Sequence, residues 1–130
     1  MTPTTDAPTA TSPITAVQYF TAKLAYEMTP WKLKGLLDKK TPDLLILDVR
    51  GADSWAEGHL PGAVSLPLPE LAGKLASLPK DKTIVTYCGN IICSLAPKAA
   101  LELAQKGFKV MELFGGIAEW KANSFPIEKA

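Results

Sequence analysis

The 130-residue sequence lacks the features of several specialised classes of protein. Its two cysteines are too few for a disulfide framework and fit a cytoplasmic protein whose thiols react or pack. No apolar run is long enough to cross a bilayer, and no Lys or Arg precedes Lys23, so we expect neither a membrane segment nor a signal peptide. Fourteen basic residues balance thirteen acidic ones without forming a basic block, so nucleic acid is not an expected partner.

The composition divides the chain into a tail, an additional helix and one domain. Residues 1–13 are almost wholly Thr, Pro, Ala and Ser, which predicts a disordered tail. In residues 14–25, Ile14, Val17, Phe20 and Leu24 recur at helical spacing. We expect this helix to pack on the domain as an extra layer. Residues 26–130 then form a single domain of common size.

Strand and helix patterns alternate along that domain. Short apolar or β-branched runs predict strands at 44–49, 63–66, 82–87 and 110–114, with an extended piece at 26–28. Helical patterns cover about 29–40, 54–57, 69–78, 94–106 and 117–122. Thr29 followed by Pro30 is a helix start signal, and Gly107 is a typical helix end. This alternation predicts an α/β fold with a largely parallel sheet and helices on both faces.

Cys88 is the strongest candidate for a reactive residue. It lies between a predicted strand end and a predicted helix start, where unpaired backbone N–H groups and the helix dipole favour an anion. This position is expected to lower the thiol pKa and to produce a nucleophilic thiolate. Gly89 would let the backbone curl around the sulfur. The alternative is a buried cysteine that only packs, which is common for free cysteine.

Three ordered motifs resemble the rhodanese-like family over nearly the whole domain. They are LDVR at 47–50 with Trp55 and GHLPGA at 58–63, VTYC at 85–88, and GGIAEW at 115–120 followed by FPI at 125–127. The resemblance implies a three-layer sandwich around a five-stranded parallel sheet. It also implies that Cys88 cycles between thiol and persulfide, taking sulfur from thiosulfate or 3-mercaptopyruvate and passing it to cyanide or a thiol. No metal or organic cofactor is implied.

The loop after Cys88 departs from the family pattern. An Arg is common five positions after the cysteine, but here that position is Cys93 and the loop has no cation. Thiosulfate would then be bound only by backbone N–H groups, so we expect weak thiosulfate activity. One lost charge-assisted contact is worth about 1.5–3 kcal/mol, or about one to two decades. The substrate-binding residues predicted for this loop are Gly89, Asn90, Ile91, Ile92, Cys93 and Ser94.

Cys93 and three polar residues complete the candidate site. Cys93 either resolves a modified Cys88 by forming a disulfide or packs beneath the loop. Asp48, Arg50 and His59 are expected to support the site by hydrogen bonds and salt bridges.

The leading hypothesis is therefore a monomeric, cytoplasmic sulfurtransferase. Its partners would be a sulfane-sulfur donor and a thiol acceptor. The alternatives are a catalytically poor protein-binding or regulatory module, and a Cys88/Cys93 redox switch.

Overall fold

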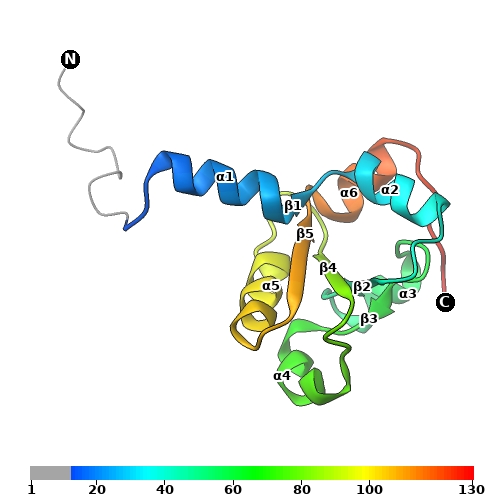
Figure 1. Cartoon of the computed structure of the whole chain (residues 1–130). Helices are drawn as coiled ribbons and strands as arrows, with labels where there is room; N and C mark the ends of the chain where they lie inside the picture. Colours follow the sequence, from blue (N-terminus) through cyan, green and yellow to red (C-terminus); the bar gives the residue numbers. More distant parts are fainter. Residues whose placement is uncertain (1–12) are drawn as a thin grey trace.

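Five parallel strands form the centre of the molecule in this computed structural model, which describes residues 13–130 (Figure 1). They are β1 (Glu27–Met28), β2 (Leu44–Asp48), β3 (Val64–Ser65), β4 (Thr83–Tyr87) and β5 (Lys109–Leu113). The order across the sheet is β1-β5-β4-β2-β3, and every neighbouring pair is parallel. The predicted five-stranded parallel sheet is confirmed. The predicted tail lies outside the described residues, except for Pro13.

Six α-helices connect or flank the strands among the described residues. They are α1 (Ala16–Tyr26), α2 (Pro30–Asp38), α3 (Ala52–Glu57), α4 (Leu71–Lys74), α5 (Leu95–Gln105) and α6 (Gly116–Ala122). The side chain of Thr29 caps α2 by accepting from the Lys32 N–H, as the Thr-Pro signal predicts. The helix predicted at 69–78 is instead α4 between two short 3₁₀ turns, Leu68–Glu70 and Leu75–Ser77. Gly73 weakens a continuous helix there.

Each face of the sheet has its own apolar core, because successive strand side chains point to opposite faces. On one face, Ile46 and Val85 pack with residues of α2 and α6, including Leu33 and Trp120. On the other, Ile84 and its neighbours pack against the helices α4 and α5. The result is the predicted three-layer α/β sandwich with helices on both faces of the sheet.

Helix α1 is exposed along its whole length and extends away from the sheet (Figure 1). Val17 and Leu24 keep 75% and 84% of their surface in solvent. The expectation that this helix packs on the domain as an extra layer is wrong for Val17 and Leu24, because their side chains remain in solvent. The reason is that α1 leads into β1, a two-residue strand at the sheet edge, so that α1 approaches the domain at its last turn and elsewhere faces α5 only across a hollow, through Tyr19 and Ala22.

The last turn of α1 contacts the edge of the sheet through the charged side chain of Lys23. The Lys23 Nζ is 2.9 Å from the Glu27 carboxylate and 5.8 Å from the centre of the Phe114 ring. Within residues 13–130, no helix has the length and apolar character needed to cross a membrane.

Candidate functional site

Cys88 directly follows the central strand β4 and is almost completely buried, with 2% of its surface exposed. Its side chain belongs to the core that contains Ala96 and Ala99 of α5. The strand end and the first turn of α5 therefore enclose the sulfur from two sides. The carboxyl end of a parallel strand is the usual location of ligand sites in α/β sheets.

Two carbonyl groups anchor the start of the Cys88 loop to the beginning of α6. The N–H of Ile117 donates to the Cys88 carbonyl at 3.0 Å, and the N–H of Ala118 donates to the Gly89 carbonyl at 3.0 Å. Gly116 makes this contact close: a Cβ added there would overlap the Cys88 carbonyl oxygen, and its φ of +62° favours glycine. Gly116 is thus part of the site, a role that was not predicted from the sequence.

Two backbone N–H groups face the Cys88 sulfur, and only one of them was predicted. The N–H groups of Gly89 and Ala96 face Cys88, and those of Gly89 and Leu95 face Cys93. Leu95 and Ala96 open α5, where helical N–H groups have no intrahelical partner. Neither residue was among those predicted for the site, although the predicted helix start near Ser94 is the signal that locates them.

Other N–H groups of the predicted cradle are used inside the loop. The Ile92 N–H donates to Asn90 Oδ1 at 3.1 Å, and the Cys93 N–H donates to the Asn90 carbonyl at 3.2 Å. Asn90 thus folds the loop into a turn, a common role for this residue. The prediction that Ile92 and Cys93 contribute free N–H groups to the sulfur is wrong for this reason. The side chain of Ile92 is 87% exposed.

The two thiols interact and have opposite pKa shifts. Burial, followed by the hydrogen bond from Cys88 to Cys93, raises the pKa of the Cys88 thiol to about 11. Burial acts to raise the pKa of Cys93 as well, but the hydrogen bonds from Cys88 and from the N–H groups of Leu95 and Gly89 lower it overall. The Cys88 Sγ also lies 3.6 Å from the Cys93 carbonyl oxygen. The prediction of a lowered pKa at Cys88 is therefore wrong, because desolvation outweighs the N–H groups.

Asp48, Arg50 and Tyr87 form a buried network at the same end of the sheet. The Arg50 guanidinium contacts both Asp48 carboxylate oxygens at 2.6–3.2 Å and donates to the Gly58 carbonyl at 2.7 Å. The Tyr87 hydroxyl donates to Asp48 at 2.7 Å and accepts from the Leu60 N–H at 3.1 Å. Tyr87 packs in the α2/α6 core, whereas Cys88 packs in the α4/α5 core. The network therefore braces the strand ends from the face opposite the sulfur.

His59 joins the loop after α3 to the C-terminal segment. Its ring stacks on Trp55 with 4.1 Å between ring centres, and its Nδ1 lies 2.7 Å from the Trp55 carbonyl oxygen. Its backbone exchanges two hydrogen bonds with Glu128. These contacts fit a residue that fixes a loop.

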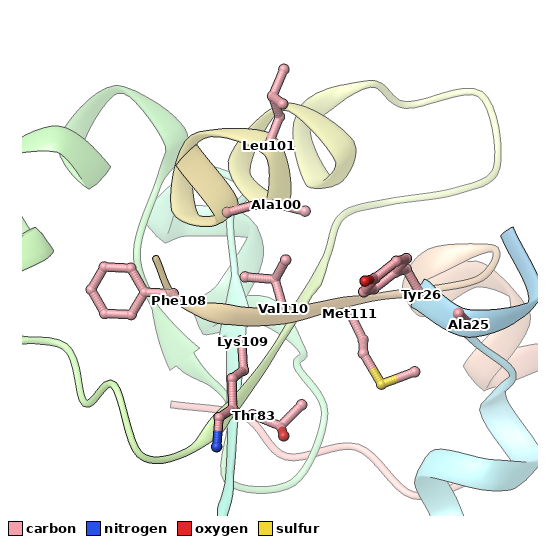
Figure 2. A pocket seen from close by; sticks show the side chains of 10 residues that line it. Ala25, Tyr26, Thr83, Ala100, Leu101, Phe108, Lys109, Val110 and Met111 are labelled. Carbon is pink, nitrogen blue, oxygen red and sulfur yellow. The ribbon is translucent and has the colours of Figure 1, made fainter. Parts of the chain in front are cut away.

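One hollow among the described residues lies away from Cys88, between α5 and β5. It has a volume of about 580 Å³ and a mainly apolar lining. Figure 2 shows β5 along its floor, with Phe108 at one end and Tyr26 at the other. Within residues 13–130, no group of three or more His, Cys, Asp or Glu side chains is placed to hold a metal ion.

The fold agrees with the results of comparison with known proteins. The sequence model of the family described as "Rhodanese-like domain" matches residues 29–123, and the chain belongs to that family. Among solved structures, the BH2092 protein of Bacillus halodurans is 36% identical with a TM-score of 0.82, over 88% of this chain and 84% of that one. The rhodanese-like domain of the Anabaena Alr3790 protein is 32% identical with a TM-score of 0.72, over 80% and 79%.

Several similar proteins carry names that refer to sulfur transfer. A sulfurtransferase of Allochromatium vinosum is 34% identical over 67% of this chain and 80% of its own length. The thiosulfate sulfurtransferase GlpE of Coxiella burnetii is 36% identical over 65% and 78%. The HTH-type transcriptional regulator Rv0324 of Mycobacterium tuberculosis is 34% identical over 70% of this chain, which spans only 40% of that regulator.

Proposed function

We propose that the protein is a sulfurtransferase that carries sulfane sulfur as a persulfide on Cys88 and passes it to a thiol or to cyanide. The observation that carries this proposal is the position of Cys88 between β4 and α5, where the N–H groups of Gly89 and Ala96 face its sulfur. The chain belongs to the rhodanese-like family and has relatives named as sulfurtransferases, which supports the same chemistry.

The reaction begins with the loss of the proton from the Cys88 thiol. Cys88 is protonated at neutral pH because burial raises its pKa to about 11, so only a small fraction of the thiol is ionised and able to react at any time. The Cys88 thiolate then attacks the outer sulfur of the donor. With thiosulfate, the S–S bond of the donor breaks and sulfite leaves with the electron pair. The N–H groups around the sulfur stabilise the negative charge of the persulfide.

The composition of the loop sets the donor and acceptor preference. Residues 88–94 contain no Lys or Arg, so doubly charged thiosulfate gains no charge-assisted contact from the loop. Ile91 and Ile92 expose 65% and 87% of their surface beside the site. We therefore expect slow reaction with thiosulfate, and faster transfer to hydrophobic or protein-bound thiols than to charged small thiols. The two free cysteines fit a protein that works in a reducing cytoplasm.

A sulfur-transfer assay with cysteine variants tests the proposal. Wild-type protein, Cys88→Ser and Cys93→Ser are each given thiosulfate, 3-mercaptopyruvate or polysulfide, and thiocyanate formed from cyanide is measured. The proposal predicts activity in wild type and in Cys93→Ser, with none in Cys88→Ser. Equal activity in Cys88→Ser would contradict it.

A second candidate is a regulatory or protein-binding module that has little catalytic activity. It is favoured by the burial of Cys88 and its raised pKa, which both slow attack on a small donor. The similarity to one part of a transcriptional regulator points the same way. Absence of thiocyanate formation with every donor, from a protein that remains folded, would favour this candidate.

A further inference from the structure

The two cysteines of the active loop lie close together but differ in burial. Cys88 is 2% exposed, whereas Cys93 is half-buried at the edge of the same apolar core. The Cys88 Sγ lies 3.6 Å from the Cys93 carbonyl oxygen, each thiol shifts the pKa of the other, and both thiols are free. The N–H of Gly89 faces both sulfurs, so the two share one polar environment. Any sulfur atom added to Cys88 is therefore next to a second thiol before an external acceptor arrives.

We propose that Cys93 resolves the Cys88 persulfide within the chain, releasing its outer sulfur as hydrosulfide and leaving a Cys88–Cys93 disulfide. This inference rests on the proposed function, because it starts from the persulfide. The Cys93 thiolate attacks the inner sulfur, which is Cys88 Sγ. A bond forms between the two Sγ atoms, the bond from Cys88 Sγ to the outer sulfur breaks, and the electron pair leaves with HS⁻. The two cysteine sulfurs are oxidised and the outer sulfur is reduced, so no further oxidant is needed.

The leaving groups favour this course over a relay of the outer sulfur to Cys93. Attack on the outer sulfur would expel the Cys88 thiolate, and a thiol of high pKa is a poor leaving group in thiol–disulfide exchange. Hydrogen sulfide is a stronger acid than the Cys88 thiol, so hydrosulfide is the better leaving group. Cys93 is the better prepared attacking thiol, because the N–H groups of Leu95 and Gly89 favour its thiolate and do not depend on the Cys88 proton.

Geometry gives the internal reaction an advantage over an external thiol. A neighbouring group within the same loop acts at a high effective concentration. The turn at Asn90 holds this arrangement, since the Cys93 N–H donates to the Asn90 carbonyl at 3.2 Å. The loop also lacks a cation that would hold the persulfide anion in place. The overall change is thiosulfate plus two thiols giving sulfite, hydrosulfide and one disulfide, which a dithiol reductant then returns to two thiols.

The test is a single-turnover experiment in the absence of oxygen and added thiols. Reduced wild-type protein and Cys93→Ser are incubated with thiosulfate or with 3-mercaptopyruvate, and both sulfide and intact mass are measured. The expected wild-type result is about one sulfide per chain and the loss of two hydrogen atoms, with a Cys88–Cys93 disulfide in the peptide map. Cys93→Ser is expected to gain one sulfur atom and to release no sulfide. Cys93→Ala gives a second variant in case the serine disturbs the loop.

The outcomes separate this inference from the proposed function. If wild type keeps the added sulfur and releases no sulfide, the inference is overturned while the persulfide carrier stands. Sulfide release from Cys93→Ser at the wild-type level would overturn it as well. If no variant gains sulfur and wild type forms no disulfide, the proposed function itself fails.

Discussion

The buried carboxylate of Asp48 should be one of the most sensitive positions in the protein. It is 0% exposed and accepts hydrogen bonds from the Arg50 backbone, the Arg50 guanidinium and the Tyr87 hydroxyl. Asp48→Asn keeps the size of the side chain but removes the charge opposite Arg50, and it turns an acceptor into an NH₂ group that faces other donors. Removing one partner of a buried ion pair costs about 3–5 kcal/mol. Because Arg50 retains some exposure, we expect a loss of about 3 kcal/mol.

Urea unfolding followed by circular dichroism measures this loss. If the slope of the unfolding free energy against urea concentration is unchanged, only the stability has altered. The matched control is Asp38→Asn, whose exposed ion pair with Lys34 predicts a change within about 0.5 kcal/mol. Tyr87→Phe should cost about 1–3 kcal/mol, since it leaves the Leu60 N–H without its acceptor. Combining it with Asp48→Asn should show a coupling of about 0.5–3 kcal/mol. A loss below about 1 kcal/mol for Asp48→Asn would refute this reasoning.

Four further predictions follow from single positions. Gly116→Ala should lower stability by at least about 1–3 kcal/mol and slow sulfur loading, because the new Cβ overlaps the Cys88 carbonyl at positive φ. The control is Gly73→Ala, whose added Cβ meets open space in α4 and should not lower stability. Equal losses of stability for the two variants in urea unfolding would argue against the contact between Gly116 and Cys88. Cys93→Arg should raise kcat/KM for thiosulfate by about one to two decades and abolish sulfide release; an unchanged value would show that the missing cation is not limiting. Alkylation followed by peptide mapping should label Cys93 before Cys88 at neutral pH, with the Cys88 rate climbing as pH rises toward about 11; the reverse order would contradict the pKa shifts. Leu24→Ser should change the free energy of unfolding by less than about 0.5 kcal/mol, whereas a larger loss would mean that α1 packs on the domain.

The regular part of the fold was predictable because local signals and burial agree there. Buried strands such as β2 and β4 are short apolar or β-branched runs, and the Thr29 cap fixes the start of α2. Helix α1 shows where this reasoning stops. Its apolar spacing gives a helix, but the position of that helix depends on β1 being a two-residue edge strand. No local pattern encodes that arrangement.

The site was predictable in position but not in its electrostatics. The strand end and helix start locate Cys88, yet the balance between burial and N–H groups depends on packing against Ala96 and Ala99. Likewise, the sequence places Cys93 five residues after Cys88 but leaves open whether the thiols meet. The turn at Asn90 brings them together, and it arises from one side-chain hydrogen bond and one backbone hydrogen bond. The role of Gly116 as the contact point of α6 is likewise visible only in three dimensions.

The most direct test of the central claim is to locate transferred sulfur by tandem mass spectrometry in Cys93→Ser, where internal resolution is blocked. After incubation with a sulfane donor and trapping of persulfides, the account predicts one added sulfur on the peptide that contains Cys88. The same treatment of a Cys88→Ser/Cys93→Ser double variant should add none. An unmodified Cys88 peptide from folded protein, with every donor tried, would contradict the claim that this cysteine carries sulfur.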